Sequence, residues 1–179
     1  LKAMRRTYDR GRYMDLVARL RDAIPNLSLT TDIIVGFPGE TEADFAETLS
    51  LIDEVGYDGA YTFIYSPRPG TEAHDTMIDD VTPEQKRDRM SRLVAAVQRS
   101  AAERSARFVG ESHEVLVEGP SRKSTPEAPE LMGRTECNRV VNFAAGPQAQ
   151  RLVGQMIDLR ITQTWAHSLR GELRVHEEA

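Results

Sequence analysis

Several features that would narrow the function are scarce in this sequence or missing from it. Cys137 is the only cysteine among 179 residues, which rules out an internal disulfide bond and is typical of a reducing cytoplasm. No apolar run approaches the roughly 20 residues that a membrane-spanning helix needs, and no charged-then-apolar leader opens the chain. We therefore expect a cytoplasmic protein without a membrane partner. The histidines are not spaced like metal ligands; they are His74, His113, His167 and His176.

The net charge of −5 argues at first against a nucleic-acid partner. The distribution of charge is more informative than its sum, because the opening segment is locally basic and contains Asp9 as its one acidic residue. A basic patch on an acidic protein can still bind phosphates. The basic residues of this segment are Lys2, Arg5, Arg6, Arg10 and Arg12.

The first half of the chain alternates between helical and strand patterns. Apolar residues at helical spacing predict an amphipathic helix over residues 11–24. Residues 27–35 then form an apolar, β-branched run that suits a parallel strand covered on both faces. A helix begins after Thr41, with Asp44 completing a weak capping box, and residues 60–65 form the next strand. This order predicts a strand–helix–strand unit in a parallel sheet.

Both predicted strands end in turns rich in glycine and proline. In an open α/β sheet, ligands bind at the carboxyl ends of the strands. We expect residues 36–40 to shape the first turn, with Glu40 binding backbone N–H groups where the following helix starts. Residues 66–81 are expected to form a loop, and Thr82-Pro83-Glu84-Gln85 a helix start. That helix extends to about Phe108, and we interpret its charged residues as a solvent-exposed face.

From Gly110 onward the helical pattern disappears and short alternating runs replace it. Five short strands separated by turns predict a small closed barrel of the oligonucleotide-binding (OB) type. The segment 119–130 between the first two strands has the composition of an exposed loop. The predicted strands are residues 113–118, 131–135, 139–143, 155–162 and 168–175.

Three motifs occur in the order found in radical S-adenosylmethionine methylthiotransferases. They are Leu1-Lys2-Ala3-Met4-Arg5-Arg6-x-Tyr8, the segment from Thr31 to Thr41, and Tyr65-Ser66-Pro67-Arg68-Pro69-Gly70-Thr71. The second half resembles the TRAM domain of the tRNA-modifying branch through residues 118–123, 133–143 and 168–172. The resemblance implies an α/β fold: the C-terminal part of a radical SAM partial (β/α) barrel over residues 1–109, then an all-β, OB-like TRAM barrel over residues 110–179.

The resemblance implies an enzyme that adds a methylthio group to C2 of N6-isopentenyladenosine beside the tRNA anticodon. It further implies S-adenosylmethionine and two 4Fe-4S clusters as cofactors, the tRNA anticodon stem-loop as partner, and a reductant protein. In this family three cysteines of a Cys-x3-Cys-x2-Cys loop hold the radical-forming cluster. Because the chain has only Cys137, and Leu1 is not an initiator methionine, we expect a C-terminal fragment that is inactive alone.

The resemblance also implies cofactor contacts. In this superfamily the backbone at the end of the fifth strand contacts the adenine of S-adenosylmethionine, which falls here on Ile34, Val35 and Gly36. Apolar side chains offer a flat surface to a base, and glycine allows its backbone to approach closely. A buried strand followed by a tight turn would give the same pattern. Tyr65, at the end of the next strand, is a second adenine contact or a core residue.

Basic residues are the candidates for binding phosphate, carboxylate or RNA. At the mouth of the expected barrel these are Arg5, Arg6 and Arg68, with Tyr8 available to stack on a base or to anchor the loop. Simple solvation at the surface is the alternative role of the arginines. In the second half, basic residues alternate with Phe143 and Trp165, as in small barrels that bind single-stranded RNA; Trp165 could instead be a core residue. The basic residues are Arg122, Lys123, Arg134, Arg139, Arg160 and Arg170.

Three other functions compete with the leading one. The methylthiotransferase branch that acts on threonylcarbamoyladenosine in tRNA shares the run from Ser66 to Thr71. The branch that acts on a ribosomal protein usually lacks the Arg68-Pro69 pair. A non-catalytic RNA-binding module would need no cofactor, and it would bind tRNA in a salt-sensitive manner through its second half.

Overall fold

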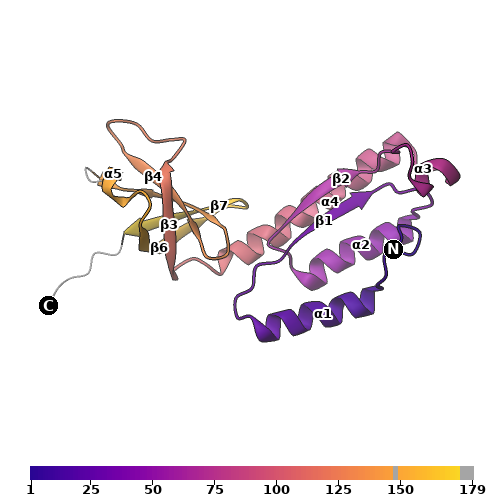
Figure 1. Cartoon of the computed structure of the whole chain (residues 1–179), viewed down its shortest axis with the longest axis horizontal. Coiled ribbons are helices and arrows are strands. Elements are labelled where there is room, and N and C mark those ends of the chain that lie inside the picture. The colour runs from indigo at the N-terminus through magenta and orange to yellow at the C-terminus, as the bar shows by residue number, and fades with distance from the viewer. Residues whose placement is uncertain (147–148, 174–179) are drawn as a thin grey trace. The chain divides into compact units, whose positions relative to one another are not determined.

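The computed structural model describes residues 1–146 and 149–173 and divides into two compact units, residues 1–100 and the residues from 101 onward (Figure 1). The first unit contains α1 (Arg10–Ala23), β1 (Thr30–Val35), α2 (Glu42–Val55), β2 (Gly59–Ile64), α3 (Glu72–Thr76) and most of α4 (Pro83–Ala106). The second contains β3 (Ser112–Pro120), β4 (Glu130–Thr135), β5 (Val140–Ala144), α5 (Ala149–Leu152), β6 (Met156–Thr164) and β7 (Ser168–Leu173). No helix among the described residues is long and apolar enough to cross a membrane.

The strand–helix–strand prediction is confirmed. Strands β1 and β2 pair in parallel, from Thr30 opposite Gly59 to Val35 opposite Ile64, and α2 connects them. Helix α3 lies in a segment predicted to be a loop. It escaped detection because it is only five residues long; the Thr71 side chain, which accepts from the His74 N–H at 3.3 Å, caps its start.

Both predicted helix starts are confirmed as capping boxes. At α2 the Thr41 hydroxyl accepts from the Asp44 N–H at 3.1 Å, and the Asp44 carboxylate accepts from the Thr41 N–H at 2.9 Å. Hydrogen bonds from the hydroxyl and backbone of Thr41 lower the pKa of the Asp44 carboxyl group. At α4 the Gln85 side chain accepts from the Thr82 N–H at 2.9 Å, and the Thr82 hydroxyl accepts from the Gln85 N–H at 3.3 Å.

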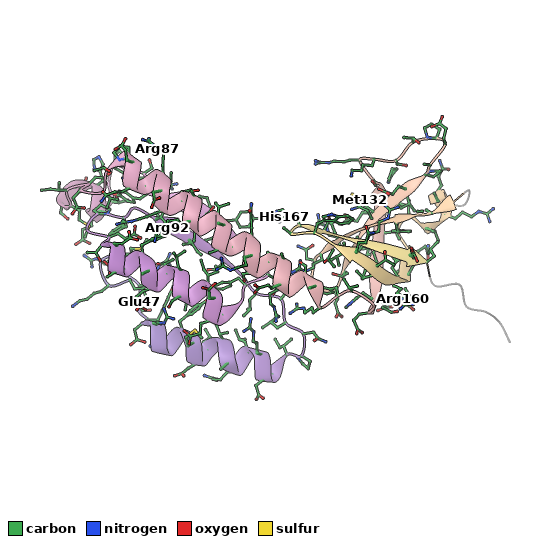
Figure 2. The ribbon with its side chains drawn as sticks, turned by 180° about the vertical axis from the view of Figure 1, so that it is seen from behind. Glu47, Arg87, Arg92, Met132, Arg160 and His167 are labelled. Atoms are coloured by element: carbon green, nitrogen blue, oxygen red, sulfur yellow. The ribbon has the colours of Figure 1, made fainter. Side chains whose placement is uncertain are left out.

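Helices α1, α2 and α4 supply most of the core of the first unit and pack with β1. The hydroxyl groups of Tyr13 and Tyr57 lie 2.7 Å apart in this core, and burial together with this hydrogen bond raises the pKa of Tyr57. Polar contacts also hold α1 on α2, because Arg10 donates to the backbone carbonyl and the carboxylate of Glu47 at 2.8 and 2.9 Å. Glu47 lies on α2 (Figure 2). The buried apolar residues are Val17, Val35, Phe45, Ile52, Val55, Tyr57, Leu93, Ala96 and Val97.

The expectation that β1 is covered on both faces is wrong, because the described residues cover only one face of the sheet. On the other face Asp32 lies opposite Tyr61 and Ile34 opposite Phe63. Tyr61 is 72% exposed, Phe63 49% and Ile34 37%. An apolar run predicts that a strand is buried on both faces only where the chain supplies partners for both. Here the helices pack on one side.

The predicted barrel is confirmed as a closed five-stranded sheet with the order β3-β4-β5-β7-β6. Strands β5 and β7 pair in parallel and the other neighbours are antiparallel. A Cβ added to Gly133 of β4 would lie 2.4 Å from the Leu116 carbonyl oxygen, so glycine is needed where β3 and β4 approach. The predicted last strand is described as far as Leu173; its remaining residues and His176 lie outside the described residues.

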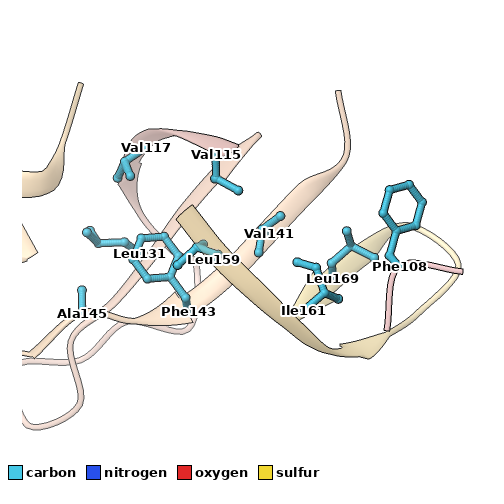
Figure 3. Packing of buried hydrophobic residues seen from close by; sticks show 10 residues of the cluster. All are labelled: Phe108, Val115, Val117, Leu131, Val141, Phe143, Ala145, Leu159, Ile161 and Leu169. Carbon is cyan, nitrogen blue, oxygen red and sulfur yellow. The ribbon is translucent and has the colours of Figure 1, made fainter. Parts of the chain in front are cut away.

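The barrel interior is filled by alternate residues of its strands (Figure 3). Phe143 is fully buried there, so the interpretation that Phe143 and Trp165 contribute with the basic residues to RNA binding is wrong for Phe143. Its partner in that interpretation, Trp165, is 51% exposed and is not a core residue. The core residues are Phe108, Val115, Val117, Leu131, Val141, Phe143, Ala145, Leu159, Ile161 and Leu169.

Candidate functional site

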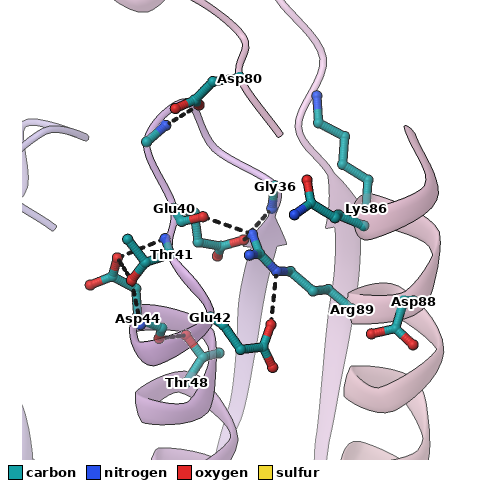
Figure 4. A network of polar contacts seen from close by, with 12 residues as sticks. Gly36, Glu40, Thr41, Glu42, Asp44, Thr48, Asp80, Lys86, Asp88 and Arg89 are labelled. Atoms are coloured by element: carbon teal, nitrogen blue, oxygen red, sulfur yellow. Dashed lines mark hydrogen bonds and ion pairs between the residues drawn. The ribbon is translucent and has the colours of Figure 1, made fainter. Parts of the chain in front are cut away.

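The turn after β1 is held in shape by two carboxylates, those of Glu40 and Asp80. Gly36 has a φ of +75°, which favours glycine, and its N–H donates to Oε2 of Glu40 at 2.7 Å (Figure 4). Glu40 was expected to bind N–H groups where the next helix starts, and this is wrong: it closes back onto the end of the strand, while Asp44 serves the helix start. The N–H of Gly39 donates to Asp80 at 2.7 Å.

Helix α4 contributes two basic residues to this turn that sequence reasoning missed. Arg89 donates from Nη1 to the Glu40 carbonyl oxygen at 2.9 Å and to Oε2 of Glu40 at 2.8 Å. Lys86 donates from Nζ to both carboxylate oxygens of Asp79, at 2.7 and 2.6 Å. Both side chains are buried, so the charged residues of α4 do not all form a solvent-exposed face. One signal was available: Lys86 and Arg89 each precede an apolar residue of the inner stripe, Met90 or Leu93, by four positions.

The four residues expected at the adenine are together at the ends of β1 and β2, where Tyr65 N–H donates to the Val35 carbonyl oxygen at 2.8 Å. The Val35 side chain is fully buried in the core, so only its backbone is available to a ligand, whereas Ile34 is partly exposed. The Tyr65 ring packs edge-on against Phe37, with centroids 5.2 Å apart. Its hydroxyl oxygen is buried and has no hydrogen-bond partner among the described residues.

The basic residues expected at the barrel mouth have different environments. The Nε of Arg5 donates to Glu72 at 2.6 Å, which ties the opening segment to α3. Arg6 and Tyr8 line a cavity of about 530 Å³ that Ile34, Phe37 and Glu40 also line. The side chain of Arg68 is exposed, and its backbone carbonyl oxygen accepts from the Thr71 hydroxyl at 2.7 Å.

In the barrel, the expected RNA-binding residues divide into two groups. Arg122 and Lys123 are exposed on the connection between β3 and β4. Arg134 instead donates to Glu118 at 3.1 Å and to the Asn138 side chain at 3.1 Å. Arg139 donates to the Ser105 hydroxyl at 2.7 Å, and its guanidinium lies 5.1 Å from the centre of the Phe108 ring. The first group is therefore better placed for a new partner than the second.

A partly buried carboxylate, that of Glu130, anchors the connection that carries Arg122 and Lys123. Glu130 accepts from the Ser121 hydroxyl at 2.5 Å and is ion-paired with Arg170. Burial opposes ionisation of Glu130, but the hydrogen bonds from Ser121 and Arg170 outweigh it and lower the pKa of this carboxyl group. Ser121 at the start of the connection is therefore bound to Glu130 at its end, and Glu130 stays ionised at neutral pH in its ion pair with Arg170.

Among residues 1–146 and 149–173, no group of three or more His, Cys, Asp or Glu side chains could hold a metal ion. Cys137, the one thiol, lies 3.2 Å from the Thr135 hydroxyl inside the barrel unit. The described residues therefore do not fit an iron–sulfur cluster, which needs several cysteine ligands.

Comparison with known proteins gives matches over both units. The Radical SAM superfamily model matches residues 1–52, and the TRAM domain model matches residues 106–173. A protein of Herminiimonas arsenicoxydans named tRNA-2-methylthio-N(6)-dimethylallyladenosine synthase is 49% identical over 177 residues, which cover 99% of this chain and 39% of that protein. Proteins of the same name from Leptothrix cholodnii and Burkholderia thailandensis are both 51% identical, over 96% and 100% of this chain and 36% and 39% of their own lengths. The chain thus spans about two fifths of the length of these relatives.

Proposed function

Because the chain carries a Radical SAM superfamily segment followed by a TRAM domain, we propose that it is the C-terminal part of a tRNA methylthiotransferase. The reaction of the whole protein adds a methylthio group to C2 of N6-isopentenyladenosine beside the anticodon, in the cytoplasm. The observation that carries this proposal is an identity of about half, over nearly the whole chain, to relatives named for that product. A reductant protein would serve the clusters, which would be held outside this chain.

We propose a functional boundary at residues 109 and 110. Two observations support it: helix α4 ends at Ala106, and β3, the first strand of the barrel, begins at Ser112. Residues 1–109 then belong to the radical SAM domain and residues 110–179 to the TRAM domain.

In this proposal the end of β1 binds the adenine of S-adenosylmethionine, the cofactor that would supply the radical when it is bound. Ile34 offers a partly exposed apolar side chain and Gly36 a backbone without a side chain. The unpartnered hydroxyl of Tyr65 supports a polar neighbour at the same strand end. Arg5, Arg6 and Arg68 would bind the phosphates of the tRNA or the carboxylate of the cofactor.

The barrel is proposed to bind the anticodon stem-loop of tRNA. An OB barrel binds oligonucleotides on the face of its second and third strands and with the loops between strands 1 and 2 and strands 4 and 5. Here those loops carry Arg122, Lys123 and Trp165. Between them, a row of outward side chains crosses β4, β5 and β7, in which Met132 pairs with Asn142 and Asn142 with Arg170.

We predict that Trp165→Ala weakens binding of an anticodon stem-loop by about 1–3 kcal/mol, because an exposed aromatic ring stacks on a base. Removing both loop charges, with Arg122→Ala and Lys123→Ala, should reduce the steepness of the plot of the logarithm of the binding constant against the logarithm of the salt concentration by about 2. Fluorescence anisotropy of a labelled stem-loop at several salt concentrations measures both. Arg19→Ala, which removes one exposed charge from α1, is the control and should leave the affinity nearly unchanged. Equal losses for Arg19 and the loop residues would refute this surface.

The enzymatic proposal is tested by mass spectrometry of nucleosides in tRNA from cells that lack the gene encoding this chain. We expect N6-isopentenyladenosine to accumulate without its methylthio group, and the intact gene to restore it. Loss of the methylthio group from threonylcarbamoyladenosine, or from a ribosomal protein in a parallel mass-spectrometric analysis of the ribosomal proteins, would leave the proposed type of reaction in place and change the proposed substrate. Normal modification of all three would favour a non-catalytic RNA-binding module.

A further inference from the structure

Two basic side chains on one face of α4 are buried against the turn that ends β1. Lys86 is 8% exposed and Arg89 is 3% exposed, and they lie three positions apart, so they project from the same side of the helix. Charged side chains are rarely buried unless they are paired, and both of these are. Both residues act on Gly36, but through different contacts.

Arg89 reaches Gly36 through a carboxylate. Its Nη1 lies 2.8 Å from Oε2 of Glu40, and the same oxygen accepts from the Gly36 N–H at 2.7 Å (Figure 4). Arg89 also binds the Glu40 carbonyl oxygen at 2.9 Å, so the guanidinium fixes both the side chain and the backbone of Glu40. The Glu40 carboxylate is therefore oriented toward the strand end by a buried positive charge.

Lys86 reaches Gly36 by packing. A Cβ added to Gly36 would lie 2.5 Å from Cγ of Lys86, so the lysine stem occupies the space beside the glycine. The ammonium group lies 5.4 Å from the centre of the Tyr65 ring and is held by Asp79. Lys86 thus touches the ends of both strands, at Gly36 and at Tyr65.

We infer that Lys86 and Arg89 are positioning residues for the ligand site at the end of β1: they fix the Gly36 backbone and the Tyr65 ring that the ligand contacts. This inference rests on the proposed function, which identifies the ligand as the adenine of S-adenosylmethionine. Neither residue touches the ligand in this scheme. Arg87 on the same helix is exposed and forms an ion pair with Glu84, three positions before it, which makes Arg87 a matched control (Figure 2).

The experiment measures S-adenosylmethionine binding by equilibrium dialysis in the longer protein to which the chain belongs under that proposal, with its clusters reconstituted. Arg89→Ala should raise the Kd for S-adenosylmethionine about tenfold, because the Glu40 carboxylate loses both contacts that fix it and no longer holds the Gly36 backbone in place. The Kd for the tRNA stem-loop should stay within about twofold, because a positioning role acts at one site whereas general unfolding would weaken both. Arg89→Lys should recover part of the loss, and Arg87→Ala should show none.

The outcomes separate this inference from the proposed function. If the unchanged protein does not bind S-adenosylmethionine, the proposed function fails. If it binds and Arg89→Ala binds equally well, the positioning role is refuted while the function stands. Should Arg89→Ala fail to fold, Lys86→Met provides the second test, since it keeps the stem beside Gly36 and removes the ammonium from Tyr65. An unchanged Kd for S-adenosylmethionine in that variant would refute the role of Lys86.

Discussion

Replacing Phe143 by alanine is expected to lower the free energy of unfolding of the barrel unit by about 3–5 kcal/mol. The ring is fully buried and lies in one cluster with Leu131, Val141 and Leu159. Truncation removes its apolar contacts and leaves a cavity that a closed sheet cannot readily collapse. A small barrel has few other core residues to compensate, so the loss is a large fraction of its stability.

Trp165 makes the measurement selective, because it is the only tryptophan of the chain and lies in the barrel unit. Tryptophan emission during urea unfolding therefore reports on the barrel, while far-UV circular dichroism reports mainly on the helices of the first unit. Leu116→Ala is the control: Leu116 lies on β3 of the same barrel but is 43% exposed, so we expect a change near 0.5 kcal/mol. Equal effects of the two substitutions would contradict the assignment of Phe143 to the core.

Much of the fold could be predicted from local patterns. Alternating residues indicated the barrel strands because each strand has one buried and one outward face, as in β4, where Leu131 and Gly133 point inward. Capping residues fixed the starts of α2 and α4, because a cap acts within one turn of chain. Both signals depend on residues that are close together in the sequence, so they can be recognised from the sequence alone.

The predictions that were wrong depend on contacts between residues that are distant in the sequence. The helical spacing places Arg89 beside the inner apolar stripe of its helix, but nothing local identifies its partner Glu40, which lies 49 positions away. The direction of the Glu40 carboxylate depends on that arginine, and a rule about helix starts therefore predicted the wrong partner. In the sequence, Phe143 and Trp165 are likewise both aromatic residues among basic ones. Only the strand register of the barrel shows that the Phe143 ring is buried and the Trp165 ring is exposed.

Replacing Gly36 by alanine is expected to lower the free energy of unfolding of the first unit by about 2–5 kcal/mol. Two effects add. A side chain at a φ of +75° costs about 1–2 kcal/mol. A Cβ placed 2.5 Å from Cγ of Lys86 adds about 1–3 kcal/mol of overpacking, because the lysine is itself fixed by Asp79. Urea unfolding followed by far-UV circular dichroism measures the change.

Gly39→Ala separates the two effects, because Gly39 has a similar φ of +80° and nothing lies within 4 Å of its added Cβ. It should therefore show only the backbone penalty, about 1–2 kcal/mol. Lys86→Ala should relieve the crowding in a double variant with Gly36→Ala, giving a coupling energy of about 1 kcal/mol or more in the double-mutant cycle. If Gly36→Ala and Gly39→Ala have equal effects, the lysine stem does not restrict Gly36. The glycine is then required for its backbone conformation alone, and Lys86 acts on the site only through Tyr65.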